Sequence, residues 1–141
     1  MDTLHQAVMR FEEAGGLDRH WPDPYLGLGR IYIYGLDDLD RAIAAFEEAG
    51  KRGFRPGVRE IAQLADGYRN RGERMRREAD GLRSLPQETD MLQKAANDYR
   101  RALVLYQQAA GFGEAGANVR QVQRRLDEVT ERLERIEDEI G

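Results

Sequence analysis

Apolar and small residues recur at alternating steps of four and three along the second half of this 141-residue chain. Because an α-helix has about 3.6 residues per turn, this spacing keeps one apolar seam facing a neighbouring helix. Three segments carry the pattern, separated by Leu85-Pro86 and by Gly111-Phe112-Gly113. The seam of the first segment comprises Ile61, Ala65, Tyr68, Gly72, Met75, Ala79 and Leu82. The pattern predicts three long helices packed as antiparallel neighbours, and no segment alternates as a strand does.

A turn at Pro86 decides which residues of the first two long helices face each other. Positions on an antiparallel hairpin then pair so that their numbers add to about 171, whichever side chains stand there. This register sets large residues opposite small ones, as close packing requires. The expected pairs are Gly72 with Tyr99, Ala65 with Tyr106, Tyr68 with Ala102 or Leu103, and Ala79 with Leu92.

The first half of the chain predicts three shorter helices. Glycine adopts the left-handed conformation of a helix C-terminus readily, so Gly15-Gly16 is expected to end the first helix. The carboxylate of Asp23 can cap free N–H groups at the start of the second helix, and Pro24 fits its first turn. The expected spans are roughly residues 2–14, then 23–34, then a third helix that Asp37 or Asp38 caps and that ends near Gly50.

Residues 25–56 resemble the tetratricopeptide repeat (TPR), a pair of helices about 34 residues long. The resemblance is carried by Tyr25, Leu28, Gly29 and Tyr32 in helix A, by Ala42, Phe46 and Ala49 in helix B, and by the closing Pro56. Ala7, Phe11 and Ala14 keep the helix-B spacing and resemble a preceding half repeat. A divergent repeat follows, with helix A at Ile61, Leu64, Ala65, Tyr68, Gly72 and Glu73 and helix B at Ala102, Tyr106 and Ala109.

The resemblance implies an all-α fold: antiparallel helix pairs in a short TPR-like solenoid, with a long helical hairpin and a C-terminal packing helix. We expect a single domain, because a chain of this length suffices for one core. Its expected parts are a half repeat at 1–16, a repeat at 23–56, an extended hairpin at 57–110 and a terminal helix at 116–141. A half repeat that lacks its helix A would expose Leu4, Val8 and Phe11, which predicts weak homo-oligomer formation or cover by the rest of a larger protein.

Few residues are suited to catalysis or metal binding. The chain has no cysteine, and its two histidines, His5 and His20, form no spaced pair. The aspartates at 37, 38 and 40 lack the glycine and glutamate of a calcium loop, so helix capping explains them better. We therefore expect no enzyme activity, no metal and no cofactor. Because the sequence has neither a long apolar run nor a signal peptide, it predicts a cytoplasmic protein that is not associated with a membrane.

The net charge is −4, but residues 51–84 hold ten basic and five acidic side chains. Five arginines fall within residues 69–77. Nucleic acid is the least favoured ligand, because no stacking aromatics accompany these arginines and the body is acidic. An acidic protein partner remains open as a second interpretation. The favoured interpretation is a solvated helix face with intrahelical pairs such as Glu73 to Arg77.

The resemblance also implies a binding surface on the side of the A helices that does not face the core. The corresponding residues are Leu26, Arg30, Ile33 and Tyr34, followed by Arg59, Ala62, Asp66, Arg69 and Asn70. An apolar patch beside arginines suits a peptide with hydrophobic and acidic groups. We therefore expect a protein–protein interaction adaptor or scaffold that binds a partner peptide or domain on the helix-A face. The alternative is a structural or regulatory, self-associating segment of a larger protein.

Overall fold

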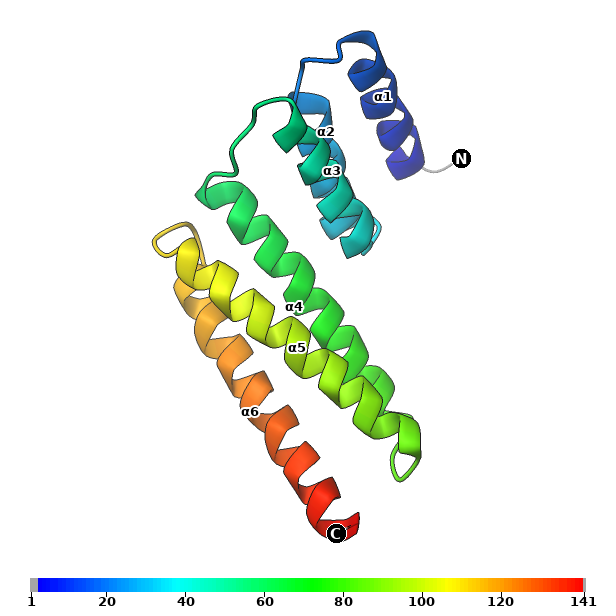
Figure 1. The fold of residues 1–141 in the computed structure, drawn as a ribbon, viewed down its shortest axis with the longest axis vertical. Coiled ribbons are helices and arrows are strands. Elements are labelled where there is room, and N and C mark those ends of the chain that lie inside the picture. The colour runs from blue at the N-terminus through cyan, green and yellow to red at the C-terminus, as the bar shows by residue number, and fades with distance from the viewer. Residues whose placement is uncertain (1–2, 141) are drawn as a thin grey trace.

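The computed structural model describes residues 3–140, which form helices and loops without any strand, so the all-α prediction is confirmed. Residues 1, 2 and 141, which the expected segments 1–16 and 116–141 include, lie outside the described residues. Short N-terminal helices are packed above three long ones (Figure 1). The elements are α1 (Thr3–Leu17), α2 (Asp23–Arg30), the π-helical turn η1 (Ile31–Gly35), α3 (Leu39–Lys51), α4 (Val58–Asp80), α5 (Pro86–Gln108) and α6 (Ala115–Ile140).

Two apolar cores hold these helices together. The N-terminal core lies between α1, α2, η1 and α3, and the second core lies between α4, α5 and α6. Leu64 on α4 packs against both cores and so joins the two groups of helices. The largest apolar side chains of the second core that are almost fully buried are Leu92, Tyr99, Tyr106, Val122 and Val129.

Aromatic rings packed on glycines set the spacing of the N-terminal helices. Phe11 on α1 lies over Gly27, where an added Cβ would come within 2.4 Å of the ring. Phe46 on α3 lies over Gly29, where an added Cβ would come within 2.6 Å of the ring. Gly27 and Gly29 are both on α2, so that helix lies between the other two and receives one ring from each. Only glycine allows backbone and ring to approach this closely.

One expected helix end and one expected helix cap are wrong. Gly15-Gly16 does not end α1, which continues to Leu17. Gly15 is a buried residue of this helix, and the Tyr25 side chain packs against it. A Cβ at position 15 would lie 2.7 Å from the Tyr25 hydroxyl oxygen, so close packing explains this glycine. Asp23 makes no capping hydrogen bond at the start of α2, although the helix does begin there. The cap of α3 is confirmed, since the Asp38 carboxylate accepts a hydrogen bond from the Arg41 N–H at 3.1 Å.

The second expected helix does not remain regular to its end. From Ile31 to Gly35 it widens into η1, where the N–H of Leu36 donates to the carbonyl of Ile31 at 3.0 Å. A wider turn changes the direction of the side chains that follow it. Both Tyr32 and Ile33 are therefore buried, and Ile33 lies near Gly67 on α4.

The expected uncovered stripe on the first helix is only partly exposed, because Leu4 remains 37 % exposed while the other two residues are covered. Phe11 packs on Gly27, Val8 is buried in the N-terminal core, and Leu4 lies against Gly35. Val8 and Phe11 thus pack within the N-terminal core, so the exposed stripe is smaller than the sequence predicted. Self-association stays a prediction.

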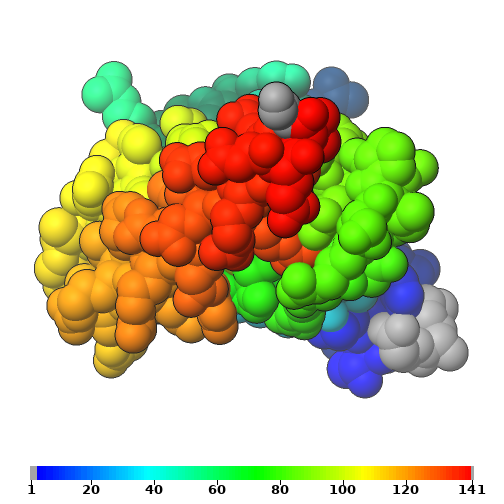
Figure 2. Space-filling model, turned by 90° about the horizontal axis from the view of Figure 1, so that it is seen from below, coloured from blue at the N-terminus to red at the C-terminus, as the bar shows by residue number. Residues whose placement is uncertain are grey.

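The long hairpin has the expected register at its centre. A Cβ added to Gly72 would lie 3.0 Å from Tyr99 Cε1, which confirms that these two residues face each other. Pro86 opens α5, as expected for a proline in the first helical turn. Viewed from below, α6 lies across the front of the bundle, beside the α4–α5 turn (Figure 2). No helix within residues 3–140 is long and apolar enough to cross a membrane.

Gly72 gives a direct test of the hairpin. Alanine is favoured over glycine inside a helix by about 1 kcal/mol, but overpacking a core costs about 1–3 kcal/mol. The Tyr99 ring is fully buried and its hydroxyl donates to Glu73 at 2.8 Å, so it cannot move aside easily. We therefore expect Gly72→Ala to lower the free energy of unfolding by about 1 kcal/mol in urea denaturation. Gly16→Ala is the control, because a Cβ there meets nothing within 4 Å; a more stable Gly72→Ala protein would contradict the packing.

Candidate functional site

The structure brings several of the expected binding residues together where η1 meets α4, but it buries two of them, Ile33 and Ala62. Ile33 is only 2 % exposed and belongs to the N-terminal core, so its expected role in partner binding is wrong. The wide turn of η1 and the cover provided by α4 explain its burial. Leu26 is half-buried against the same core, whereas Arg30 is exposed. Tyr34 is 55 % exposed and is the most open aromatic residue of this surface.

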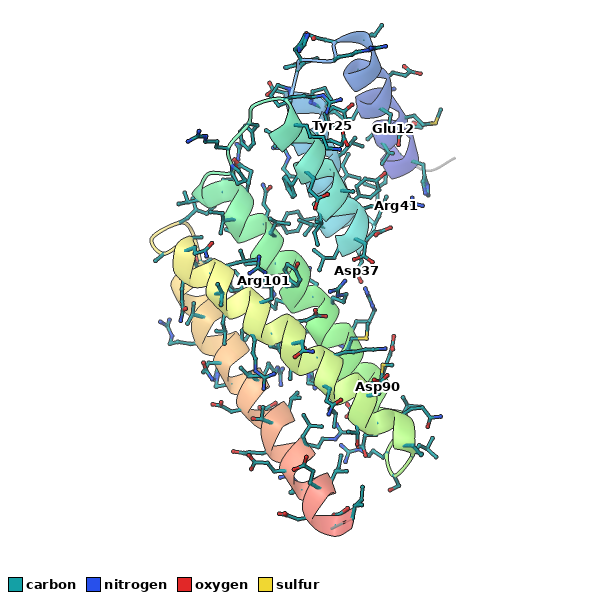
Figure 3. All side chains as sticks on the ribbon, in the orientation of Figure 1. Glu12, Tyr25, Asp37, Arg41, Asp90 and Arg101 are labelled. Carbon is teal, nitrogen blue, oxygen red and sulfur yellow. The ribbon has the colours of Figure 1, made fainter. Side chains whose placement is uncertain are left out.

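A hollow of about 340 Å³ lies beside Tyr34, between η1 and the outer face of α4. We call it the η1–α4 hollow. Ile33 contributes to its wall, and Asp37 reaches into it from the loop between η1 and α3 (Figure 3). The complete lining is Ile33, Tyr34, Asp37, Asn70, Glu73, Arg74 and Arg77.

Asp66 holds the exposed tyrosine in place. The hydroxyl of Tyr34 donates to one carboxylate oxygen of Asp66 at 2.5 Å, and the hydroxyl of Tyr106 donates to the other. Burial, followed by the hydrogen bond to Asp66 and its negative charge, raises the pKa of Tyr34 and of Tyr106 above the ordinary tyrosine value. Both hydroxyls therefore stay protonated. Asp66, expected to contact a partner, instead fixes the Tyr34 ring.

Two further expected contact residues also have structural partners. Arg69 on α4 donates to the side-chain oxygen of Asn118 on α6 at 3.1 Å and to that of Asn70 at 3.3 Å. Arg59 forms an ion pair of 2.9 Å with the buried carboxylate of Glu60. These contacts occupy part of the hydrogen-bonding capacity that a partner would otherwise use.

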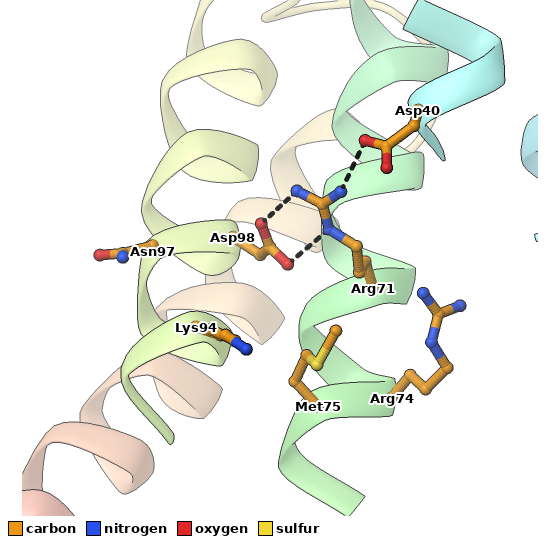
Figure 4. A pocket seen from close by; sticks show the side chains of 7 residues that line it. All are labelled: Asp40, Arg71, Arg74, Met75, Lys94, Asn97 and Asp98. Atoms are coloured by element: carbon orange, nitrogen blue, oxygen red, sulfur yellow. Dashed lines mark hydrogen bonds and ion pairs between the residues drawn. The ribbon is translucent and has the colours of Figure 1, made fainter. Parts of the chain in front are cut away.

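Most arginines of the stretch 69–77 form hydrogen bonds and ion pairs with other residues of the chain, which corrects the expectation of a solvated face. Arg71 makes two 2.9 Å bonds to the buried carboxylate of Asp98 on α5 and a third of 3.2 Å to Asp40 on α3 (Figure 4). Its side chain is only 25 % exposed. The expected pair of Glu73 with Arg77 is replaced by Glu73 with Arg76 at 2.8 Å. Among these five arginines, only Arg77 is exposed and has no hydrogen-bond or ion-pair partner within residues 3–140.

A second hollow, of about 210 Å³, lies on α6 and is lined by Gln121, Arg124, Arg125 and Glu128. We call it the α6 hollow. Arg125 forms an ion pair of 3.3 Å with Glu73, which lines the η1–α4 hollow, so the two hollows adjoin at this pair. Burial alone would raise the pKa of Glu73, but the hydrogen bonds from Arg76 and Tyr99 lower it overall. Glu73 therefore remains charged and keeps Arg125 in place.

Sequence reasoning missed the role of α6 in this surface, although a signal was present. Glu73 and Asp80 are seven residues apart on α4, and Arg125 and Arg132 are seven residues apart on α6. Residues at this spacing lie on one face of a helix. In the structure Arg125 pairs with Glu73, and Arg132 pairs with Asp80 at 2.7 Å.

No protein-family profile, curated protein or solved structure matches the chain.

Arg132 gives a test of how α6 is attached. It also binds Glu88 on α5 and donates to the carbonyl of Ala79 at 3.1 Å. Its hydrogen bonds hold the pKa of Asp80 and of Glu88 below their ordinary values. We expect Arg132→Met to lower the free energy of unfolding at pH 7 by about 1–3 kcal/mol, because the buried Glu88 carboxylate and the Ala79 carbonyl lose their charged donor.

The pH dependence checks the cause of that loss. A carboxyl group with a lowered folded-state pKa stabilises the fold above its unfolded pKa, and this stabilisation is lost as the pH falls. The parent protein should therefore lose stability as the pH is lowered through about 4.5 and below, and Arg132→Met should lose less over that range. Arg135→Met, at an exposed arginine of the same helix, is the control. Equal acid sensitivity of the parent protein and Arg132→Met would contradict the role given to Arg132.

Proposed function

We propose that this chain is a protein-interaction adaptor, built as a short TPR-like array, that holds a partner peptide on the surface formed by η1, α4 and α6. The observation that carries the proposal is the Tyr34 ring. It is 55 % exposed beside the η1–α4 hollow, while its hydroxyl is fixed by Asp66. Tyrosine is one of the side chains that most often anchor protein interfaces.

A fixed ring is suited to binding because little conformational freedom remains to be lost when a partner arrives. Ordering a mobile side chain at an interface costs about 0.5–1.5 kcal/mol. The hydrogen bond to Asp66 has already ordered Tyr34 in the unbound protein. Arg30 precedes Tyr34 by four residues, is exposed, and has no partner within residues 3–140. An aromatic ring with a nearby free guanidinium offers both an apolar and a polar contact.

Absence of catalysis is part of the same proposal. The residues that line the two hollows are arginines, carboxylates, amides, one phenol and the isoleucine Ile33, and most of the charged ones are paired with each other. The lining residues include no histidine, cysteine or serine that could act as a nucleophile beside a base. Such a surface is suited to recognition rather than to bond breaking.

A selection from random peptides tests the adaptor proposal. A displayed library of 12-residue peptides is panned on the immobilised protein, and enriched peptides are measured by fluorescence anisotropy. Replacing Arg30 and Tyr34 together by alanine should weaken their binding at least about tenfold, because two anchors of about 1–2 kcal/mol each exceed the 1.4 kcal/mol that a factor of ten requires. The helical circular dichroism signal should be unchanged.

Two controls separate binding from folding. Tyr34→Phe keeps the ring but removes the bond to Asp66 that orders it, so it should weaken binding by no more than about 0.5–1.5 kcal/mol, the cost of ordering one side chain. Val104→Ala alters another exposed apolar residue, 44 % exposed on α5 and outside both hollows, and should have no effect. If no peptide is enriched, or if enriched peptides bind the double variant normally, the proposed surface is wrong.

A further inference from the structure

The two adjoining hollows carry carboxylates that are already neutralised. Asp37 pairs with Arg74 at 2.5 Å, and Glu128 pairs with Arg125 at 3.2 Å. Glu73 is bound by Arg76 and Arg125, and it accepts the hydroxyl of Tyr99. No carboxylate that lines these hollows is therefore left to attract a cation.

Two arginines of the same hollows are not neutralised. Arg77 lines the η1–α4 hollow and Arg124 lines the α6 hollow. Both are exposed, and within residues 3–140 neither has a hydrogen-bond or ion-pair partner. Arg77 lies one helical turn beyond Glu73 on α4, and Arg124 precedes Arg125 on α6, so each free cation lies near one member of the Glu73–Arg125 pair along its own helix. The available charge of this surface is positive although the chain as a whole carries −4.

The geometry favours carboxylates of a polypeptide over the phosphates of a nucleic acid. A guanidinium presents paired donors that match a carboxylate, and two separate arginines can hold two separate acidic side chains. Binding to a nucleic-acid strand uses a continuous basic track and several aromatic rings for stacking. Here the other arginines of the hollows are neutralised, and Tyr34 is the only aromatic ring that lines them.

We infer that the partner is a polypeptide segment with at least two acidic side chains and an apolar residue. Arg77 and Arg124 bind the acidic side chains near the Glu73–Arg125 pair, and the apolar residue packs on Tyr34. This inference rests on the proposed function and extends its site onto α6. It adds Arg124 and α6 to the binding surface, and it selects Arg77 from the arginine stretch 69–77 as the residue that contacts an acidic partner.

A matched pair of probes tests the inference. An enriched peptide from the selection is synthesised with a fluorescein label, together with a twin in which every Asp and Glu is replaced by Asn or Gln. We expect the acidic peptide to bind the parent protein about tenfold more tightly than its twin. Arg77→Gln with Arg124→Gln should weaken the acidic peptide about tenfold and leave the twin unchanged. Because these contacts are solvent-exposed, raising the salt from about 0.05 to 0.5 M should also weaken the acidic peptide.

The control variant is Arg10→Gln with Arg55→Gln. It removes the same charge at two exposed arginines, one on α1 and one in the loop between α3 and α4, neither of which lines a hollow. Its affinity for the acidic peptide should stay within about twofold of the parent protein, since distant exposed charges are screened. An equal loss in both double variants would show only general attraction and would overturn the inference.

The remaining outcomes distinguish this inference from the adaptor proposal. Enriched peptides that need Tyr34 but lack acidic residues, and that bind Arg77→Gln/Arg124→Gln normally, would overturn the acidic partner and leave the adaptor standing. Failure to enrich any peptide would overturn both. If a labelled oligothymidine of 20 nucleotides binds the parent protein more tightly than any peptide and binds the same double variant more weakly, that outcome would identify a nucleic-acid surface instead.

Discussion

The contact of aromatic rings with glycine backbones is the constraint on which the rest of the fold depends. Phe11 from α1 packs on Gly27 of α2, and Phe46 from α3 packs on Gly29 of the same helix. In the long hairpin Tyr99 faces Gly72. Each contact lets two helices approach more closely than any side chain on the glycine would permit. Because these contacts lie at the centre of each helix pair, they decide which faces of α2 and α4 remain for the surface.

Arginine side chains join the helices in addition to these apolar contacts. Arg71 joins α4 to α5 and α3, while Arg132 joins α6 to the other end of the hairpin. These ion pairs hold the charged groups in place. Removing one partner of a buried pair would leave the other charge without compensation. The ion pairs also explain why a strongly charged sequence leaves few cations free on this surface. The unpaired Arg77 and Arg124 are informative for that reason.

Helical periodicity and turn residues were enough to predict the all-α class, the hairpin at Pro86 and the facing of Gly72 and Tyr99. They were not enough to predict η1, because a π-helical turn has no simple residue signature and its widening buried Ile33. Gly15 was misread as a helix end, since the same residue type serves both for a turn and for close packing. Of the residues proposed to bind a partner, Arg30 and Tyr34 are exposed. The contribution of α6 depended on pairing between distant helices, which local patterns do not report.

The most direct test of this account is a double-mutant cycle on Gly29 and Phe46, read by urea denaturation. A Cβ on Gly29 would lie within 2.9 Å of three atoms at the far end of the Phe46 ring, and leucine lacks those atoms. If ring-on-glycine packing sets the helix spacing, Gly29→Ala should cost at least about 1 kcal/mol less in the Phe46→Leu background than in the parent protein. Additive effects, agreeing within about 0.5 kcal/mol, would contradict the claim that this contact fixes how α2 and α3 pack.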